Sequence, residues 1–229
     1  MMKIFDKINK NWIVLALLMI IFNKSNAQEV RFGIFANPLL SWMKTDVSNI
    51  KGSGGRVGFD AGLMMDKFFT KRYAFTTGIS INTMGGSLQY KDGKRGFQTS
   101  DSTVNLVPNA IVKYTLQYIH IPLALKFRTT EIGYMTYFAQ VGFDPMINIK
   151  ARGNINMSGL SNVNISKEIN PLYLAYHISA GVEYKIVGTT SLMAGLTYMN
   201  GFTDVTNNSG STTEKTVINR FELRLGIIF

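Results

Sequence analysis

The chain has no cysteine among its 229 residues and contains only two histidines and five prolines. Without cysteine it can form neither disulfides nor thiolate metal sites, and it has no cysteine that could carry a lipid anchor. Long apolar runs are also scarce. The run Trp12–Phe22 has 11 residues, whereas a membrane-spanning helix needs about 20. A bundle of membrane helices is therefore excluded.

Acidic residues are few as well, with 14 Asp and Glu against 24 Lys and Arg, which leaves a net charge of +10. A basic chain can bind nucleic acid when its charges gather on one helix or stripe. Here the basic residues are scattered and form no such stripe. We therefore expect no nucleic-acid partner.

Residues 1–27 have the three parts of a secretory signal peptide. Three lysines precede the short apolar run, and small residues follow it at Ser25-Asn26-Ala27. We expect cleavage before Gln28, which leaves residues 28–229 as a single domain. An uncleaved anchor is the alternative, but the apolar run is short for one.

From Val30 onward the sequence alternates between apolar residues and small or polar ones, the period of a β-strand with two different faces. Eight strands are predicted, at 30–43, 56–68, 73–84, one ending near 128, 134–149, 172–186, 190–202 and 217–229. Asn37-Pro38 interrupts the first of these and predicts a bulge or bend.

The connections between these strands alternate in length. They are tight at 69–72, 129–133 and 187–189, and long and polar at 44–55, 85–109, 152–170 and 200–216. Short turns at one end and long loops at the other are typical of transmembrane barrels, whose short turns are periplasmic. The sequence thus predicts an all-β fold, an eight-stranded antiparallel up-and-down transmembrane β-barrel.

A soluble eight-stranded barrel such as a lipocalin is the rival interpretation, with the apolar face turned inward. The interior of eight strands is narrow, so large aromatic residues fit better outside, and glycines and charges fit better inside. Aromatic residues near the strand ends predict two interfacial girdles, which include Phe68 at the short turns and Tyr114 and Tyr173 at the long loops.

The last predicted strand has a continuous apolar row of one parity. Its members are Phe221, Leu223, Leu225, Ile227 and Phe229. This row resembles the C-terminal strand of Gram-negative outer-membrane barrels, and the resemblance implies an insertion signal read by the barrel assembly machinery. The last strand of a soluble sandwich is the alternative.

Four stretches resemble the PorT-like outer-membrane β-barrel proteins. They are Tyr118–Phe127 (YIHIPLALKF), Glu131–Tyr134 (EIGY), Tyr137–Gly142 (YFAQVG) and Ala180–Tyr184 (AGVEY). The resemblance covers most of the chain after residue 27 and implies an outer-membrane barrel. Some members serve a secretion and gliding apparatus, and most have no assigned activity. The chain departs from the family at His120, where an acidic residue is usual.

The inward parity carries charges of both signs. In a narrow lumen each buried charge needs a partner, so we expect a structural network that plugs the barrel, since an open channel would leave these charges unpaired. Its members are expected to be Asp60, His120, Lys126, His177, Glu183, Arg220, Glu222 and Arg224. The inward parity also holds Asp66 and Lys185.

Two alternative interpretations give some inward residues a catalytic or metal-binding role. His177, Ser179 and Glu183 share one parity, which is reminiscent of the triad of an outer-membrane lipid A deacylase. A lipid-cleaving triad must meet lipid, however, and these residues point into the lumen. His120 and His177 lie singly on different strands, without the close spacing of metal ligands. We expect no catalytic residues, no cofactor and no metal.

The sequence thus predicts a non-enzymatic outer-membrane protein with an interaction or envelope-structural role. Outer-membrane lipid, anionic lipopolysaccharide and the barrel assembly machinery are its expected partners, together with an envelope or secretion-system protein. The alternatives are an accessory of a secretion or gliding apparatus, a narrow porin and a lipid A-modifying enzyme.

Overall fold

The computed structural model describes residues 29–92, 96–100, 102–157, 160–207 and 215–229. The expected signal peptide, 1–27, lies outside these residues. No helix within the described ranges is long and apolar enough to cross a membrane.

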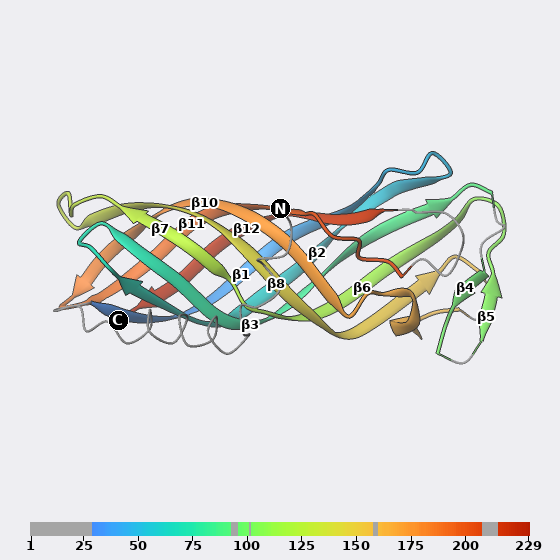
Figure 1. Cartoon of the computed structure of the whole chain (residues 1–229), viewed down its shortest axis with the longest axis horizontal. Helices are drawn as coiled ribbons and strands as arrows, with labels where there is room; N and C mark the ends of the chain where they lie inside the picture. Colours follow the sequence, from blue (N-terminus) through green and yellow to red (C-terminus); the bar gives the residue numbers. More distant parts are fainter. Residues whose placement is uncertain (1–28, 93–95, 101, 158–159, 208–214) are drawn as a thin grey trace, which may run out of the picture.

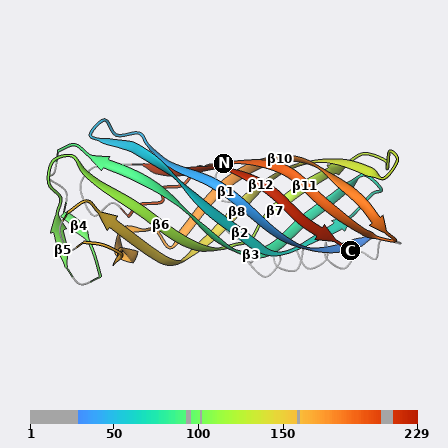
Figure 2. The ribbon, with the colours of Figure 1, turned by 180° about the vertical axis from the view of Figure 1, so that it is seen from behind.

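The described chain forms one closed antiparallel barrel of strongly tilted strands (Figures 1 and 2). Its strands are β1 (Val30–Thr45), β2 (Ile50–Phe68), β3 (Tyr73–Tyr90), β6 (Ala110–His120), β7 (Leu123–Arg128), β8 (Met135–Ile155), β10 (Leu172–Val187), β11 (Thr190–Gly201) and β12 (Thr216–Ile228). β6 and β7 share one position in the ring, because both pair with β3 and with β8. β1 pairs with β12 and closes the ring. The prediction of an eight-stranded up-and-down barrel is confirmed.

The structure has no bulge at Asn37-Pro38, where a bulge or bend is predicted from the sequence. β1 keeps one register with β2 through both residues and has the same register with β12 on either side of them. Proline lacks a backbone donor, and the backbone pairing of β1 with β12 is interrupted at this point. The side chain of Asn37 connects the two strands here. Its Oδ1 accepts a hydrogen bond from the backbone N–H of Leu225 at 2.9 Å.

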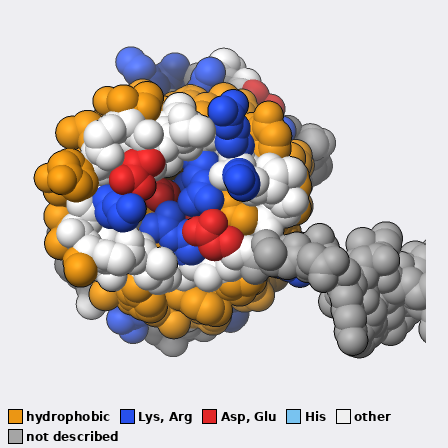
Figure 3. Space-filling model, turned by 90° about the vertical axis from the view of Figure 1, so that its left-hand side faces the viewer, with side chains coloured by type: hydrophobic (Ala, Val, Ile, Leu, Met, Phe, Trp, Pro, Cys, Tyr) orange, Lys and Arg blue, Asp and Glu red, His pale blue; other side chains and the backbone are white. Residues whose placement is uncertain are grey.

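We call the half of the barrel nearer the short turns the lower half and the half nearer the long loops the upper half. In the lower half, the outward rows of every strand are apolar and exposed. This belt includes Phe32, Leu63, Ile79, Leu125 and Leu196, each at least 46% exposed. Figure 3 views the barrel from the short-turn end and shows hydrophobic side chains around its outside, with acidic and basic side chains in the mouth. The belt has the lipid-facing character that the predicted orientation of the strands requires.

Several strands extend further at the long-loop end than predicted. β2 begins at Ile50, β3 ends at Tyr90 and β8 ends at Ile155, so the loops expected at 44–55, 85–109 and 152–170 are shorter. Above the apolar belt the polarity of the two faces is reversed: outward positions such as Gln89 are polar, and inward positions such as Leu88 are fully buried. Because loops are also polar, the polar outward residues of these strand ends were interpreted as parts of the loops.

The interior of the long-loop half is an apolar core, where a polar lumen was expected. Tyr114, Tyr118 and Tyr173 are at most 1% exposed inside it. The assignment of Tyr114 and Tyr173 to an outer girdle is therefore wrong, and Phe68, 3% exposed, is likewise buried at the other end. Aromatic rings fit inside here because the external loops fold over the barrel mouth and exclude water.

The long loops have ordered structure of their own. They contain the β4 (Gly96–Gln98) and β5 (Thr103–Asn105) hairpin, β9 (Val163–Asn164) and the 3₁₀ turn η2 (Ser166–Glu168), gathered at the right-hand end of Figure 1. Their apolar side chains complete the core; these are Phe97, Leu106, Ile165, Ile169 and Val205, each at most 4% exposed. The buried Glu168 accepts a hydrogen bond from the backbone N–H of Gln98 at 2.5 Å and thereby joins two of the loops.

Candidate functional site

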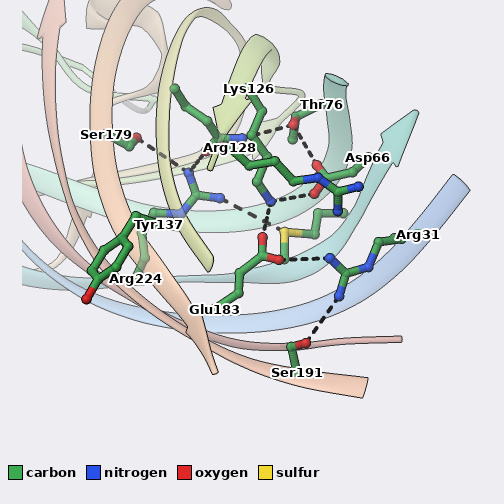
Figure 4. A network of polar contacts seen from close by, with 12 residues as sticks. Arg31, Asp66, Thr76, Lys126, Arg128, Tyr137, Ser179, Glu183, Ser191 and Arg224 are labelled. Carbon is green, nitrogen blue, oxygen red and sulfur yellow. Dashed lines mark hydrogen bonds and ion pairs between the residues drawn. The ribbon is translucent and has the colours of Figure 1, made fainter. Parts of the chain in front are cut away.

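The candidate site is the polar interior of the lower barrel, which is built from inward side chains of all eight strand positions of the ring. The first group of contacts centres on Lys126 of β7 (Figure 4). Its ammonium donates to Asp66 Oδ2 at 2.6 Å and to Glu183 Oε1. Glu183 Oε2 also accepts a hydrogen bond from Arg31 Nη1 at 2.8 Å. Two carboxylates and two cations thus neutralise one another, with all four side chains at most 9% exposed.

Polar side chains extend this group across the lumen to Arg224 of β12. Arg224 donates to Gln140 Oε1, whose amide donates to Thr76 Oγ1 at 2.9 Å, and Thr76 donates to Asp66 Oδ1 at 2.6 Å. Arg224 also lies 3.4 Å from Ser179 Oγ. The carboxamide of Gln140 therefore connects a cation on one wall with a carboxylate on another.

The second group lies nearer the middle of the barrel and centres on His120. One ring nitrogen lies 3.1 Å from Asp60 Oδ2 and the other lies 2.8 Å from Asp144 Oδ1. Asp144 also holds the ring of His177, with Oδ2 2.8 Å from Nδ1. A histidine placed between two ionised carboxylates satisfies both only with a proton on each ring nitrogen.

Arg220 extends this second group to β12. It lies 3.6 Å from Asp60 Oδ2 and 3.1 Å from Glu222 Oε2. Glu222 accepts a further hydrogen bond from Asn37 Nδ2 at 2.6 Å. The eight residues expected in the lumen all lie there, and their contacts form two groups, where one network had been expected.

Sequence reasoning missed two charged members of the lumen, Arg31 and Asp144. Both have inward parity on predicted strands. Arg31 directly precedes the outward Phe32, and Asp144 lies two residues after the inward Gly142, so applying the alternation to the whole length of both strands would have found them. Lys185 had been grouped with the inward charges but is 43% exposed at the rim, where it pairs with Glu131 at 3.1 Å. A residue near a strand end leaves the enclosed region even when its parity is inward.

Glycine makes room for the ring of Phe138 inside this narrow barrel. A Cβ built at Gly181 would lie 2.6 Å from the tip of the Phe138 ring, which is inside van der Waals contact. Phe138 in turn lies beneath the ammonium of Lys126, 4.9 Å from the ring centroid to Nζ. The inward glycine therefore permits a cation–π contact that supports the first group.

The triad interpretation finds no matching contacts. His177 bonds Asp144, Ser179 lies 2.9 Å from Thr197 Oγ1, and Glu183 is occupied by Arg31 and Lys126. Within the part of the chain that the structure describes, no group of three or more His, Cys, Asp or Glu residues is arranged to hold a metal ion.

A cavity of about 30 Å³ lies between the two groups, which is room for about one water molecule. His120, Asp144, His177 and Arg220 are among its lining residues. A larger hollow of about 340 Å³ opens at the short-turn mouth, where Lys71 and Arg128 face Glu29 and Glu131. The cavity between the two groups is too small for an ion with its hydration shell.

The closed ring, the apolar belt and the enclosed charges define an integral barrel of the outer-membrane type. Residues 24–207 match the family model described as "Outer membrane protein beta-barrel domain", and the chain belongs to this family. No curated protein matches the sequence.

Solved structures of outer-membrane barrels resemble the chain at low identity. Neisserial surface protein A is 12% identical, with 86% of this chain and 95% of that chain covered and a TM-score of 0.47. OprG from Pseudomonas aeruginosa is 10% identical, with 88% and 95% covered and a TM-score of 0.46. Ail, the attachment invasion locus protein of Yersinia pestis, is 14% identical, with 88% and 99% covered and a TM-score of 0.42.

Proposed function

We propose that this outer-membrane protein is a closed, non-conducting and non-enzymatic barrel whose ordered external end is an interaction surface. The filling of the interior carries this proposal. An apolar core occupies the long-loop half, and two groups of paired charges occupy the lower half. An ion crossing the barrel would have to displace both.

The conductance of the purified barrel in a planar bilayer tests the closed lumen. We expect no stable unitary conductance from the wild type or from Glu222→Gln, because neighbouring side chains still fill an eight-stranded interior. A stable, large conductance in the wild type would overturn the proposal and favour a narrow porin. The heat-modifiable gel shift of each sample verifies that the barrel is folded.

The external end supports an interaction role because its loops are fastened to one another. Besides the contact between Glu168 and Gln98, the backbone of Ile169 bridges that of Thr206. Asn170 donates from its side chain to the carbonyls of Asp204 and Thr206, both at 3.0 Å. A pre-ordered surface loses little conformational entropy when a partner binds.

The second candidate is an accessory of a protein secretion or gliding apparatus, favoured by the resemblance of Tyr118–Phe127 and Ala180–Tyr184 to PorT-like proteins. Purification of the native complex in mild detergent tests this candidate together with secretion assays of a deletion strain. Normal secretion without the protein would count against it. A lipid A mass spectrum of the same strain tests the enzymatic alternative, for which we expect no change.

The proposed partners follow from the three surfaces of the barrel. Membrane lipid is proposed to surround the apolar belt. Anionic lipopolysaccharide is proposed to face the long-loop end, where Lys44, Lys51, Lys113 and Lys150 are exposed. The barrel assembly machinery is proposed to read the outward row of β12 during insertion.

A further inference from the structure

The outer wall of the barrel carries a polar hollow directly above the apolar belt. On three adjacent strands the paired row Ile81–Ile119–Ile147 is apolar, and Ile149 of β8, 48% exposed, follows it at the register shift. The next paired row along the same strands is Thr83, Gln117 and Lys150. The surface therefore changes over a short distance along the strands from apolar to polar and cationic.

The hollow has a volume of about 420 Å³. Its lining residues are Arg56, Thr83, Thr115, Gln117, Lys150, Arg152 and Asn162. They include three cations, two hydroxyls and two carboxamides, and no Asp or Glu. Such a lining offers hydrogen-bond donors and positive charge to an anion.

Local backbone geometry directs the three cations to this place. A register shift of β8 against β6 between Gln117 and Tyr118 places Lys150 opposite Gln117. Arg152 is held by a hydrogen bond from Nη1 to the carbonyl of Asn162 at 3.1 Å. The two cations of β8 thus lie on the outer wall beside Thr115 of the adjacent β6 and two strands away from Thr83 of β3.

Arg56 reaches the hollow because β2 departs from its regular pairing with β3 between Gly54 and Phe59. The hydroxyl of Ser41 donates to the carbonyl of Gly85 at 2.9 Å and accepts from its N–H at 2.9 Å, so β1 contacts β3 directly here. The side chain of Arg56 lies over Gly85, with Cδ 3.4 Å from a Cβ built there. Its Nε is buried and has no hydrogen-bond partner in the protein.

We propose that this hollow binds the phosphorylated headgroup of an anionic glycolipid of the outer leaflet, the lipid A portion of lipopolysaccharide. The long loops mark the external side of the barrel, so the hollow lies at the level where the outer-leaflet headgroups meet water. Acyl chains of the same molecule lie along Ile81, Ile119 and Phe59. The inference rests on this orientation and is independent of whether the lumen conducts.

The location favours a lipid over a soluble anion. A soluble anion would gain nothing from the belt, whereas a lipid with a charged headgroup satisfies the cations and the apolar wall together. The hydroxyls and carboxamides of the hollow suit phosphate and sugar oxygens, which accept hydrogen bonds.

Lipid A retention by the purified full-length barrel tests the proposal. The protein is exchanged into detergent with a fixed amount of bisphosphorylated lipid A, and bound lipid is measured by native mass spectrometry. We expect the double variant Lys150→Gln/Arg152→Gln to bind at least tenfold more weakly than the wild type. The matched control Lys44→Gln/Lys51→Gln removes two lysines from outside the hollow and should bind like the wild type.

Two further arms identify the ligand. Lipid A from which both phosphates have been removed should bind the wild type as weakly as bisphosphorylated lipid A binds the double variant. Inorganic pyrophosphate in excess should not displace bound lipid A. Equal binding by wild type and double variant would overturn the site, and full displacement by pyrophosphate would overturn its assignment to a lipid.

Folding is checked by the heat-modifiable gel shift, which both double variants should retain because the substituted side chains lie outside the barrel core. If the double variant failed to fold, Lys150→Gln alone would replace it, with Lys51→Gln as its control. A conductance measurement on the same samples reports on the closed lumen, so failure of one proposal is distinguishable from failure of the other.

Discussion

Arg31 and Glu183 join the beginning of β1 to β10 across the barrel mouth, with Nη1 and Oε2 2.8 Å apart. The two residues are 152 positions apart in sequence, and both are buried. Glu183 also pairs with Lys126 of β7, so one carboxylate ties three strand positions together. The pair shows that the lower barrel is held by contacts across its lumen as well as by the hydrogen bonds of its wall.

Lys126→Met should lower the stability of the folded barrel. The change leaves Asp66 and Glu183 as facing carboxylates in an enclosed site, and removing one partner of a buried pair typically costs about 3–5 kcal/mol. Thermal unfolding in detergent, followed by the gel shift, measures the effect.

Lys185→Met is the matched control, because Lys185 and Glu131 are both 43% exposed and exposed pairs contribute little. A Lys126→Met barrel that unfolded at the temperature of the control would contradict the role assigned to the first group of contacts.

Phe97→Ala should open the external end of the barrel while the lower half stays folded. Phe97 is fully buried in the apolar core and meets the ring of Tyr114 with centroids 6.3 Å apart. Removing a buried phenyl ring typically costs about 3–5 kcal/mol, and this cost falls on the hairpin of β4 and β5. Limited proteolysis between Lys91 and Lys113 should accelerate.

The exposed Phe69 in the opposite turn provides the comparison, as Phe69→Ala leaves the core intact. Equal protease resistance of Phe97→Ala and wild type would show that the hairpin does not depend on the core.

Leu123→Arg and Ala180→Arg should both impair assembly in the membrane. Both residues point outward: Ala180 lies in the middle of β10, and Leu123, at the start of β7, pairs with Thr77 in the middle of the apolar belt. An arginine on the lipid face near the bilayer midplane costs about 2–4 kcal/mol. Folding yield into lipid vesicles measures the loss. Leu192→Val changes the outward row of β11 conservatively and should fold like the wild type. Equal yields for all three would refute the lipid-facing assignment.

Phe229→Ala should reduce insertion into the outer membrane more than it reduces the stability of the folded barrel. The backbone of Phe229 donates to Phe32 at 2.8 Å and accepts from it at 3.0 Å, and this substitution keeps both hydrogen bonds. A deletion would remove them along with the ring. Tyr134→Ala, which removes an exposed aromatic side chain from the turn before β8, serves as the comparison. Normal outer-membrane levels of Phe229→Ala would argue against the insertion signal.

The lower barrel was predictable because each of its strands separates two different environments. In Tyr73–Ile81 the outward residues contact lipid and the inward ones face the lumen. Apolar residues therefore alternate with small or polar ones at a period of two in the local sequence. The short turns were predictable for the same reason, as they interrupt this period. Seen from one strand at a time, the parity of Lys126 and Glu183 was enough to place both inside.

The upper barrel was not predictable in this way. Along β6, Val112, Tyr114, Leu116 and Tyr118 are buried inside, while lower on the same ring position Leu123 and Leu125 are apolar and outside. The apolar residues of the alternation therefore face inward above the membrane boundary and outward below it. The pattern of a single strand does not show where that boundary lies.

The amino-acid sequence by itself determined the strands of the lower barrel, their inward and outward faces and the tight turns between them, because these depend on neighbours one or two residues apart. Only the tertiary structure decided which inward charges meet. Asp144 reaches both His120 and His177 because the stagger of the closed ring brings three strands to one level, and the two contacts span 24 and 33 residues. Such contacts depend on register and curvature accumulated around the barrel, which no local pattern encodes.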